Sequence, residues 1–508
     1  MEDQLWKLAN SHFEMKAYES AAFYADKLVT ISGKSDLNFV YLLASCYLQN
    51  KEYPRVTHIL EKHNLLHYSI KTQVLAAQAL IASKDYQTCI RILSENVQQP
   101  DKDINWQFLK HLYMGKAHEA RESKQLAAEQ YILALKSDPT CIEAFSSLID
   151  KQLLTAEEEI KLIDELDLEN EKWLKEFYQA KLKIFSNPGS ELQNLQLQSN
   201  IDVMLALANQ LFSTHKVNQA FELSSKIIRE DPYHLGAVPL HCGCMAALGE
   251  IGELYNLSHN LVKEYSDSPA AWYAAGVYYY AIKKYEYARK FFVKSYKIDR
   301  DYLPAWISYG HTYAAQDQSD QAMRAYRTVS RLFPGCYLAN LFMGMEYLRT
   351  KNLRIALMSF ELAKQVNSAD PIVWNEIGVV FYKKGEYIRA NEVLQEALKL
   401  CEGVITSTAE TVMFNYAHTF QKLRNYPKAI ELYQKCIQSN SKNASTYTAL
   451  GLAYYFSNQI QEAVDCFNKA LFLKSNDRFT NDLLYIALFE CSEDLPMQVE
   501  PEFSPEML

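Results

Sequence analysis

The stretch WYAAGVYYYAIKKYEYARKFF, residues 272–292, decides the fold because its spacing returns along the chain. Gly276 and Ala288 recur at steps of 34 residues, and Trp272 recurs in the same register. The recurring residues, which we expect to pack the units together, are Trp272, Gly276, Ala288, Trp306, Gly310, Ala322, Gly344, Ala356, Trp374, Gly378, Ala390, Gly451 and Ala463. A fixed period of this length predicts a solenoid of one repeated unit.

Two helices fit inside each unit. Large and small residues at positions 4, 7, 8 and 11 form one apolar stripe, and positions 20, 24 and 27 form a second. The small residues at positions 8 and 20 let two antiparallel helices approach closely. This pattern resembles the tetratricopeptide repeat. The resemblance implies an all-α superhelix, an α-solenoid of stacked antiparallel helix pairs.

The regularity of the units varies along the chain and suggests a division into parts. Looser repeats predict an N-terminal array over residues 1–184, and clear ones predict a C-terminal superhelix over 201–478. The polar stretch 185–200 is expected to join them. A capping helix is expected over 479–490, and the acidic, proline-containing residues 491–508 are expected to be disordered.

Composition excludes several classes of function. The chain has 508 residues and a net charge of −9, without a long basic run, so we expect no nucleic-acid partner. The longest apolar run, 272–282, is far below the roughly 20 residues that cross a bilayer, so no membrane association is expected. The N-terminus lacks the layout of a signal peptide. We therefore expect an intracellular protein.

No catalytic signature is present, so we expect no enzyme activity, no cofactor and no small-molecule substrate. The most ligand-like group is His241, Cys242 and Cys244. Residues two apart on a helix point about 200° away from each other, and Cys242 occupies a small-residue packing position. We therefore expect no metal site there. An enzyme with its active site on the repeats remains an alternative, and it predicts a deep polar cleft.

First helices of such repeats line a concave groove, which is the usual binding surface. The residues expected there from their repeat position are Tyr273, Tyr280, Asn375, Tyr382, Asn415, His418 and Tyr455. Tyrosine gives rigid contact area and asparagine can pair with a ligand backbone. Tyr278 and Tyr287 fit neither the packing set nor the groove set. We expect them at a contact between repeats or between subunits.

An adaptor that binds chaperone tails is a second alternative. Such adaptors grip a C-terminal carboxylate with paired basic residues and asparagines. Asn375, Lys383, Asn415 and Lys422 form a partial set of that kind. The aromatic groove and the extra repeats fit this alternative poorly.

Several segments outside the repeat consensus resemble one family, the cell-division-cycle-sixteen subunits of the anaphase-promoting complex. The similar segments are 18–28, 154–159, 257–265, 306–326, 344–348, 443–451 and 462–471. The resemblance implies a scaffold subunit, itself without ligase activity, of a ubiquitin ligase that drives mitotic exit. It also implies a homodimer through the N-terminal repeats, a small assembly subunit held in the groove, and other tetratricopeptide subunits stacked outside.

Overall fold

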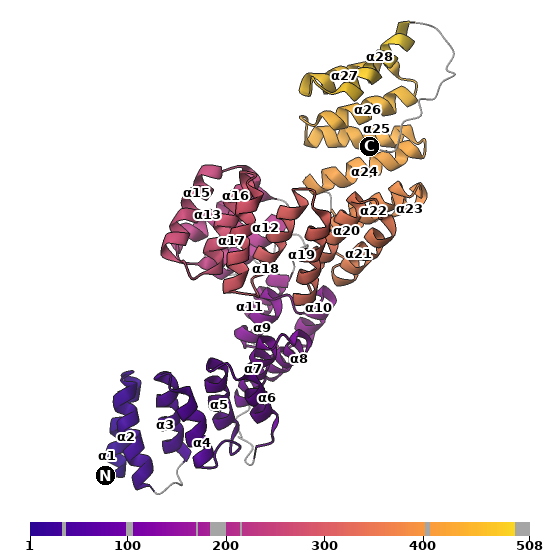
Figure 1. Ribbon diagram of the computed structural model, residues 1–508. Coiled ribbons are helices and arrows are strands. Elements are labelled where there is room, and N and C mark those ends of the chain that lie inside the picture. The colour runs from indigo at the N-terminus through magenta and orange to yellow at the C-terminus, as the bar shows by residue number, and fades with distance from the viewer. Residues whose placement is uncertain are drawn as a thin grey trace.

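The computed structural model describes residues 1–32, 37–97, 105–168, 171–182, 200–213, 216–401 and 407–492. Over these residues the chain forms α-helices and one short 3₁₀ helix, without a strand. Antiparallel helix pairs stack into an elongated solenoid, with α1 to α7 at one end and α24 to α28 at the other (Figure 1). The prediction of an all-α tetratricopeptide superhelix is confirmed.

The N-terminal helices are α1 (Glu2–Glu14), α2 (Tyr18–Ile31), α3 (Leu37–Gln49), α4 (Tyr53–Lys62), α5 (Ile70–Ala82), α6 (Tyr86–Ser94), α7 (Asn105–Ala120), α8 (Lys124–Ser137), α9 (Ile142–Asp150), α10 (Ala156–Glu165) and α11 (Lys172–Leu182). The middle helices are α12 (Ile201–Ser213), α13 (Val217–Glu230), the 3₁₀ helix η2 (Leu235–Ala237), α14 (Val238–Leu248), α15 (Ile251–Glu264), α16 (Pro269–Ala281), α17 (Tyr285–Ile298), α18 (Leu303–Ala314), α19 (Ser319–Leu332), α20 (Tyr337–Arg349) and α21 (Leu353–Val366). The last helices are α22 (Pro371–Lys383), α23 (Tyr387–Leu400), α24 (Ser407–Lys422), α25 (Tyr426–Ser439), α26 (Ala444–Phe456), α27 (Ile460–Leu473) and α28 (Arg478–Ser492).

The recurring glycines let an aromatic ring of the second helix rest on the first helix. A Cβ atom added to Gly276 would lie 2.4 Å from the ring of Phe292, and one added to Gly310 would lie 2.3 Å from the ring of Tyr326. Both rings are buried, and Ala288 is fully buried beside them. Any larger residue at the glycine position would push the two helices apart.

The three recurring tryptophans fix the start of their helices. The indole Nε1 atoms of Trp272, Trp306 and Trp374 donate to a backbone carbonyl six residues earlier, at 2.7, 3.0 and 2.8 Å. The Nζ atom of Lys294 lies 3.2 Å from the centre of the Trp272 ring. Each bond ties a first helix to the turn that precedes it, which keeps successive pairs in one orientation.

The turn inside each pair uses a left-handed residue that the sequence did not reveal. Lys283, Asp317 and Lys351 have φ values of 62°, 59° and 60° at equivalent positions of their repeats. Gly385 has φ +83° at the same position of the next repeat. Because left-handed backbone favours glycine, lysine and aspartate here carry a conformational cost.

A contact between distant parts of the chain joins the N-terminal helices to the middle of the solenoid. The backbone N–H of Gly335 donates to the carbonyl of Gln152 at 2.8 Å. The Nζ atom of Lys124 lies 2.6 Å from Asp301, and the Lys124 side chain is only 7% exposed. We call these two pairs the long-range contact. The start of α8 and the turn after α9 accordingly meet the turns before α18 and after α19, in the middle of the solenoid (Figure 1).

The described core does not divide at the predicted joint, whose residues 185–199 lie outside the described part. One cluster of buried side chains runs from Leu112 to Val203, so it includes both sides of that segment. The Nε2 atom of Gln210 in α12 also donates to the carbonyl of Ala180 in α11, at 2.8 Å. The division into parts stays a prediction, as does the tail, whose residues 493–508 are not described.

Among the described helices, none combines the length and the apolar character that crossing a bilayer requires.

Candidate functional site

First helices of successive pairs lie in a row and contact one another at most of its steps. Contacts join α14 to α16, α16 to α18, α20 to α22, α22 to α24 and α24 to α26. The seven residues predicted for the groove all belong to this row. The structure places some of them at its surface and buries others.

Tyr273 of α16 is buried rather than open to a ligand. It is 8% exposed, and its ring centre lies 5.8 Å from those of Phe292 and Tyr302. Burial raises the pKa of the Tyr273 phenol to about 12. Tyr280, one helical heptad further on, is half-buried, and its ring meets the ring of Tyr285 edge-on at 5.5 Å. Of these two tyrosines, Tyr280 is therefore the accessible one.

A chain of amide hydrogen bonds crosses from α22 to α24. The Nδ2 atom of Asn415 donates to Oδ1 of Asn375 at 2.9 Å. The Nδ2 atom of Asn375 in turn donates to Oε1 of Glu376 at 3.1 Å. Asn375 is buried, and burial raises the pKa of Glu376. Part of the hydrogen-bonding capacity of both asparagines is thus used to couple neighbouring repeats.

His418 pairs with a buried tyrosine of the second helix. Its Nδ1 atom lies 3.0 Å from the hydroxyl of Tyr433. Burial, with Lys422 nearby, lowers the pKa of His418 to about 4, so the imidazole is neutral at physiological pH. His311 and Tyr326 repeat this pair at 2.8 Å in α18 and α19. The sequence offered a signal for it, since the two histidines occupy the same position of their repeats.

Tyr382 stands out beside this pair because its hydroxyl is buried without a hydrogen-bond partner among the described residues. Its ring meets that of Tyr387 edge-on at 5.4 Å. A buried hydroxyl that forms no hydrogen bond costs free energy, which a bound acceptor would recover. Tyr382 is therefore the predicted groove residue whose chemistry points most directly to a missing partner.

Tyr455 lies at the far end of the row and is engaged by the last helix. Its hydroxyl donates to Oε1 of Glu490 in α28 at 2.5 Å, and the tyrosine is buried. The surface-accessible members of the predicted set are thus Tyr280, Tyr382, Asn415 and His418, all half-buried.

The cysteine-rich segment of α14 is part of the core. Cys242 and Cys244 are buried, and burial raises the pKa of the Cys244 thiol to about 11. The Nδ1 atom of His241 lies 2.9 Å from Oγ of Ser224. Within the described ranges, no three residues of the ligand types His, Cys, Asp and Glu are grouped to hold a metal ion.

Residues 14–96 match the family model "Anaphase-promoting complex, cyclosome, subunit 3", and residues 408–473 match a tetratricopeptide-repeat model. Anaphase-promoting complex subunit 6 of Arabidopsis thaliana is 34% identical, covering 95% of this chain and 96% of the relative. The cell division cycle protein 16 homolog of Homo sapiens is 31% identical, covering 95% and 83%.

A solved structure agrees with these relatives. The crystal structure of the APC/C hetero-tetramer Cut9-Hcn1 matches with a TM-score of 0.76 at 29% identity, covering 96% of both chains. A repeat solenoid alone would account for a shared fold. The sequence identity, however, extends over nearly the whole of both chains. The chain therefore belongs to the family of anaphase-promoting complex subunit 6, the cell division cycle protein 16 family.

Proposed function

We propose that the chain is a non-catalytic scaffold subunit of the anaphase-promoting complex, a multi-subunit ubiquitin ligase that controls mitotic progression. The single observation that carries this is the 34% identity to a subunit of that complex along 95% of the chain. Its place of action would be the nucleus and cytoplasm. Its partners would be a second copy of itself, a small assembly subunit and other tetratricopeptide subunits.

The complex membership is tested by affinity purification of the tagged full chain from mitotic cells. Other subunits of the ligase should co-purify in comparable amounts, with a small protein among them. Recovery of chaperones in their place, displaced by free chaperone C-terminal peptide, would favour the alternative adaptor function. Recovery of neither group contradicts the proposal.

The groove is the proposed site for the small subunit. The unpaired Tyr382 hydroxyl supports this, because it can donate a hydrogen bond to a backbone carbonyl of a bound segment. Tyr382→Phe should lower the recovery of the small subunit about fivefold to tenfold, the value of one hydrogen bond, and should leave the free chain at least as stable as before, because it removes an unpaired hydroxyl. Tyr433→Phe is the matched control. It removes a hydroxyl that contacts His418, so it should lower the stability of the free chain. Equal recovery with Tyr382→Phe and the natural chain would count against this site.

Homodimerisation is proposed for the region of residues 1 to about 150. Exposed apolar side chains on α1 and α2 and in the turn between them support it, among them Leu8, Met15 and Phe23. Light scattering should give the mass of a dimer, and Phe23→Asp should shift it toward the monomer. Phe472→Asp, at an exposed position of α27, is the control and should leave the dimer intact. A monomer at all protein concentrations contradicts this part of the proposal.

A further inference from the structure

Aromatic rings from three successive helices form a continuous row on the surface. Tyr255 of α15 lies 5.2 Å from Tyr278 of α16, which lies 5.2 Å from Tyr279. The Tyr279 ring stacks at 5.6 Å on Tyr287 and at 5.1 Å on Phe291, both in α17. These five rings are called the aromatic row. Tyr278 thus contacts the preceding repeat, as expected from the sequence.

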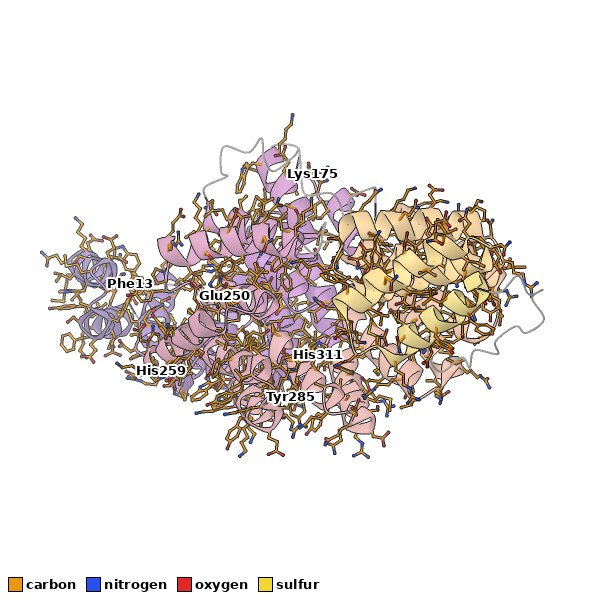
Figure 2. The ribbon with its side chains drawn as sticks, turned by 90° about the horizontal axis from the view of Figure 1, so that it is seen from above. Phe13, Lys175, Glu250, His259, Tyr285 and His311 are labelled. Carbon is orange, nitrogen blue, oxygen red and sulfur yellow. The ribbon has the colours of Figure 1, made fainter. Side chains whose placement is uncertain are left out.

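The aromatic row lies apart from the groove and is open at both ends. Tyr255 is 48% exposed and Tyr287 is 52% exposed. Tyr279 is one residue before Tyr280, so the two point in directions about 100° apart on α16. Figure 2 shows His259 of α15 and Tyr285 of α17 along the same side of the molecule. The two end rings of the aromatic row are therefore accessible to a ligand.

Helix α17, which carries two rings of the aromatic row, lies in a basic stretch of an otherwise acidic protein. Residues 283–300 contain seven lysines and arginines against two acidic residues, whereas the whole chain carries a net charge of −9. The Nζ atom of Lys290 lies 5.4 Å from the centre of the Tyr287 ring. Lys294 lies in the same way over Trp272. The local positive charge favours an acidic ligand.

The stacking decides which kind of acidic ligand fits. Nucleic-acid bases need free ring faces. The Tyr279 ring is stacked on Tyr287 at an interplanar angle of 28° and on Phe291 at 18°. Lys290 lies over Tyr287. Because the ring faces are occupied, the aromatic row presents ring edges and phenol hydroxyls to a ligand. The edges are electropositive and the hydroxyls donate hydrogen bonds, so carboxylates and backbone carbonyls complement them.

Extended segments that contain proline present such carbonyls at a reduced ordering cost, and aromatic surfaces are their usual docking sites. We propose that the aromatic row binds an acidic, proline-containing segment of a partner protein. This goes beyond the proposed scaffold role, because neither the groove nor the dimer region takes part in it.

The test is fluorescence anisotropy with the purified full chain and a labelled probe peptide. Residues 493–508, EDLPMQVEPEFSPEML, supply a probe of the required chemistry, with five acidic residues and three prolines. The peptide should bind saturably and more weakly as salt is raised. A chain carrying both Tyr255→Ser and Tyr287→Ser should bind it about tenfold or more weakly, as expected for two aromatic contacts. Lys290→Glu should weaken it further by reversing a charge.

The control is Tyr485→Ser, which removes an exposed tyrosine of α28 outside the aromatic row and should leave binding unchanged. Thermal unfolding by circular dichroism verifies that every variant is folded. Three results overturn the proposal: no saturable binding, equal binding by the natural chain and the double tyrosine variant, or tighter binding of an oligothymidylate that displaces the peptide. Loss of binding with Tyr382→Phe instead would place the peptide in the groove and overturn it as well.

Discussion

Replacement of Gly335 by alanine should open the long-range contact. The N–H of Gly335 donates to the Gln152 carbonyl at 2.8 Å. A Cβ atom on residue 335 would lie 2.1 Å from the carbonyl oxygen of Leu154 and 2.7 Å from that of Gln152. Both obstacles are backbone atoms, so no change of side-chain rotamer relieves the overlap. The two segments must separate.

The size of the effect follows from that geometry. A carbon and a carbonyl oxygen normally approach to about 3.3 Å, so the segments must part by about 1 Å. This breaks one hydrogen bond, which costs about 1 kcal/mol. Overpacking beside the buried side chains of Phe333 and Cys336 costs about a further 1–3 kcal/mol. We expect the free energy of unfolding to fall by about 2–4 kcal/mol in all.

Urea unfolding of the full chain, followed by circular dichroism, measures the loss. Small-angle scattering should at the same time show a larger radius of gyration. Gly252→Ala is the matched control, because its Cβ atom would meet nothing within 4 Å, on helix α15. It should be neutral or stabilising by up to about 1 kcal/mol. If Gly335→Ala unfolds at the same urea concentration as the natural chain and keeps its radius, the reasoning about this contact is wrong.

Two further predictions concern acid stability and the turns. Burial lowers the pKa values of His241, His311 and His418 to about 4, so the unfolded chain takes up protons below about pH 6.5 while the folded chain does not. The free energy of unfolding should therefore fall as the pH drops from 6.5 toward 4, by up to about 2 kcal/mol per histidine at pH 5. A urea-unfolding midpoint that is the same at pH 7 and pH 5 would refute this. Gly385→Ala should lower the free energy of unfolding by about 1–2 kcal/mol, because the φ of residue 385 is +83°. Lys283→Gly, at the equivalent position, should leave the stability unchanged or slightly higher. Equal melting curves for Gly385→Ala and the natural chain would contradict the idea that a side chain is strained at this turn position.

The sequence predicted the solenoid because its packing repeats every 34 residues. Gly276 and Gly310 each face a ring of their own repeat, so their spacing alone identifies the helix pair. The left-handed turn went unpredicted for the opposite reason. Its position is occupied by lysine at 283 and 351, by aspartate at 317 and by glycine at 249 and 385, so no single residue type marks it along the chain.

For the groove, the sequence predicted only which side chains lie on the groove face of the first helices. The position of a residue in its repeat gives the direction of its side chain, but not which other residues cover it. Tyr273 has the expected direction, yet Tyr302 from the following turn packs against its ring. Tyr455 is covered in the same way by Glu490 of the last helix. Tyr302 is the last residue of the unit that begins at Pro269, and Glu490 lies beyond the last unit, so neither covering residue occupies a recurring packing position. The long-range contact was invisible for a related reason, since no local pattern connects Lys124 with Asp301.

The long-range contact also limits how such a chain can change in length. Lys124 and Gln152 meet Asp301 and Gly335 only if the helices between them complete the rotation that brings the two ends together. Insertion or deletion of a whole 34-residue unit within that interval would leave every local helix pair intact. It would nevertheless move the two sides of the long-range contact out of register with each other. Repeats can be gained or lost beyond either end without this penalty. Growth by duplication is therefore permitted at the termini of this solenoid and forbidden inside the interval.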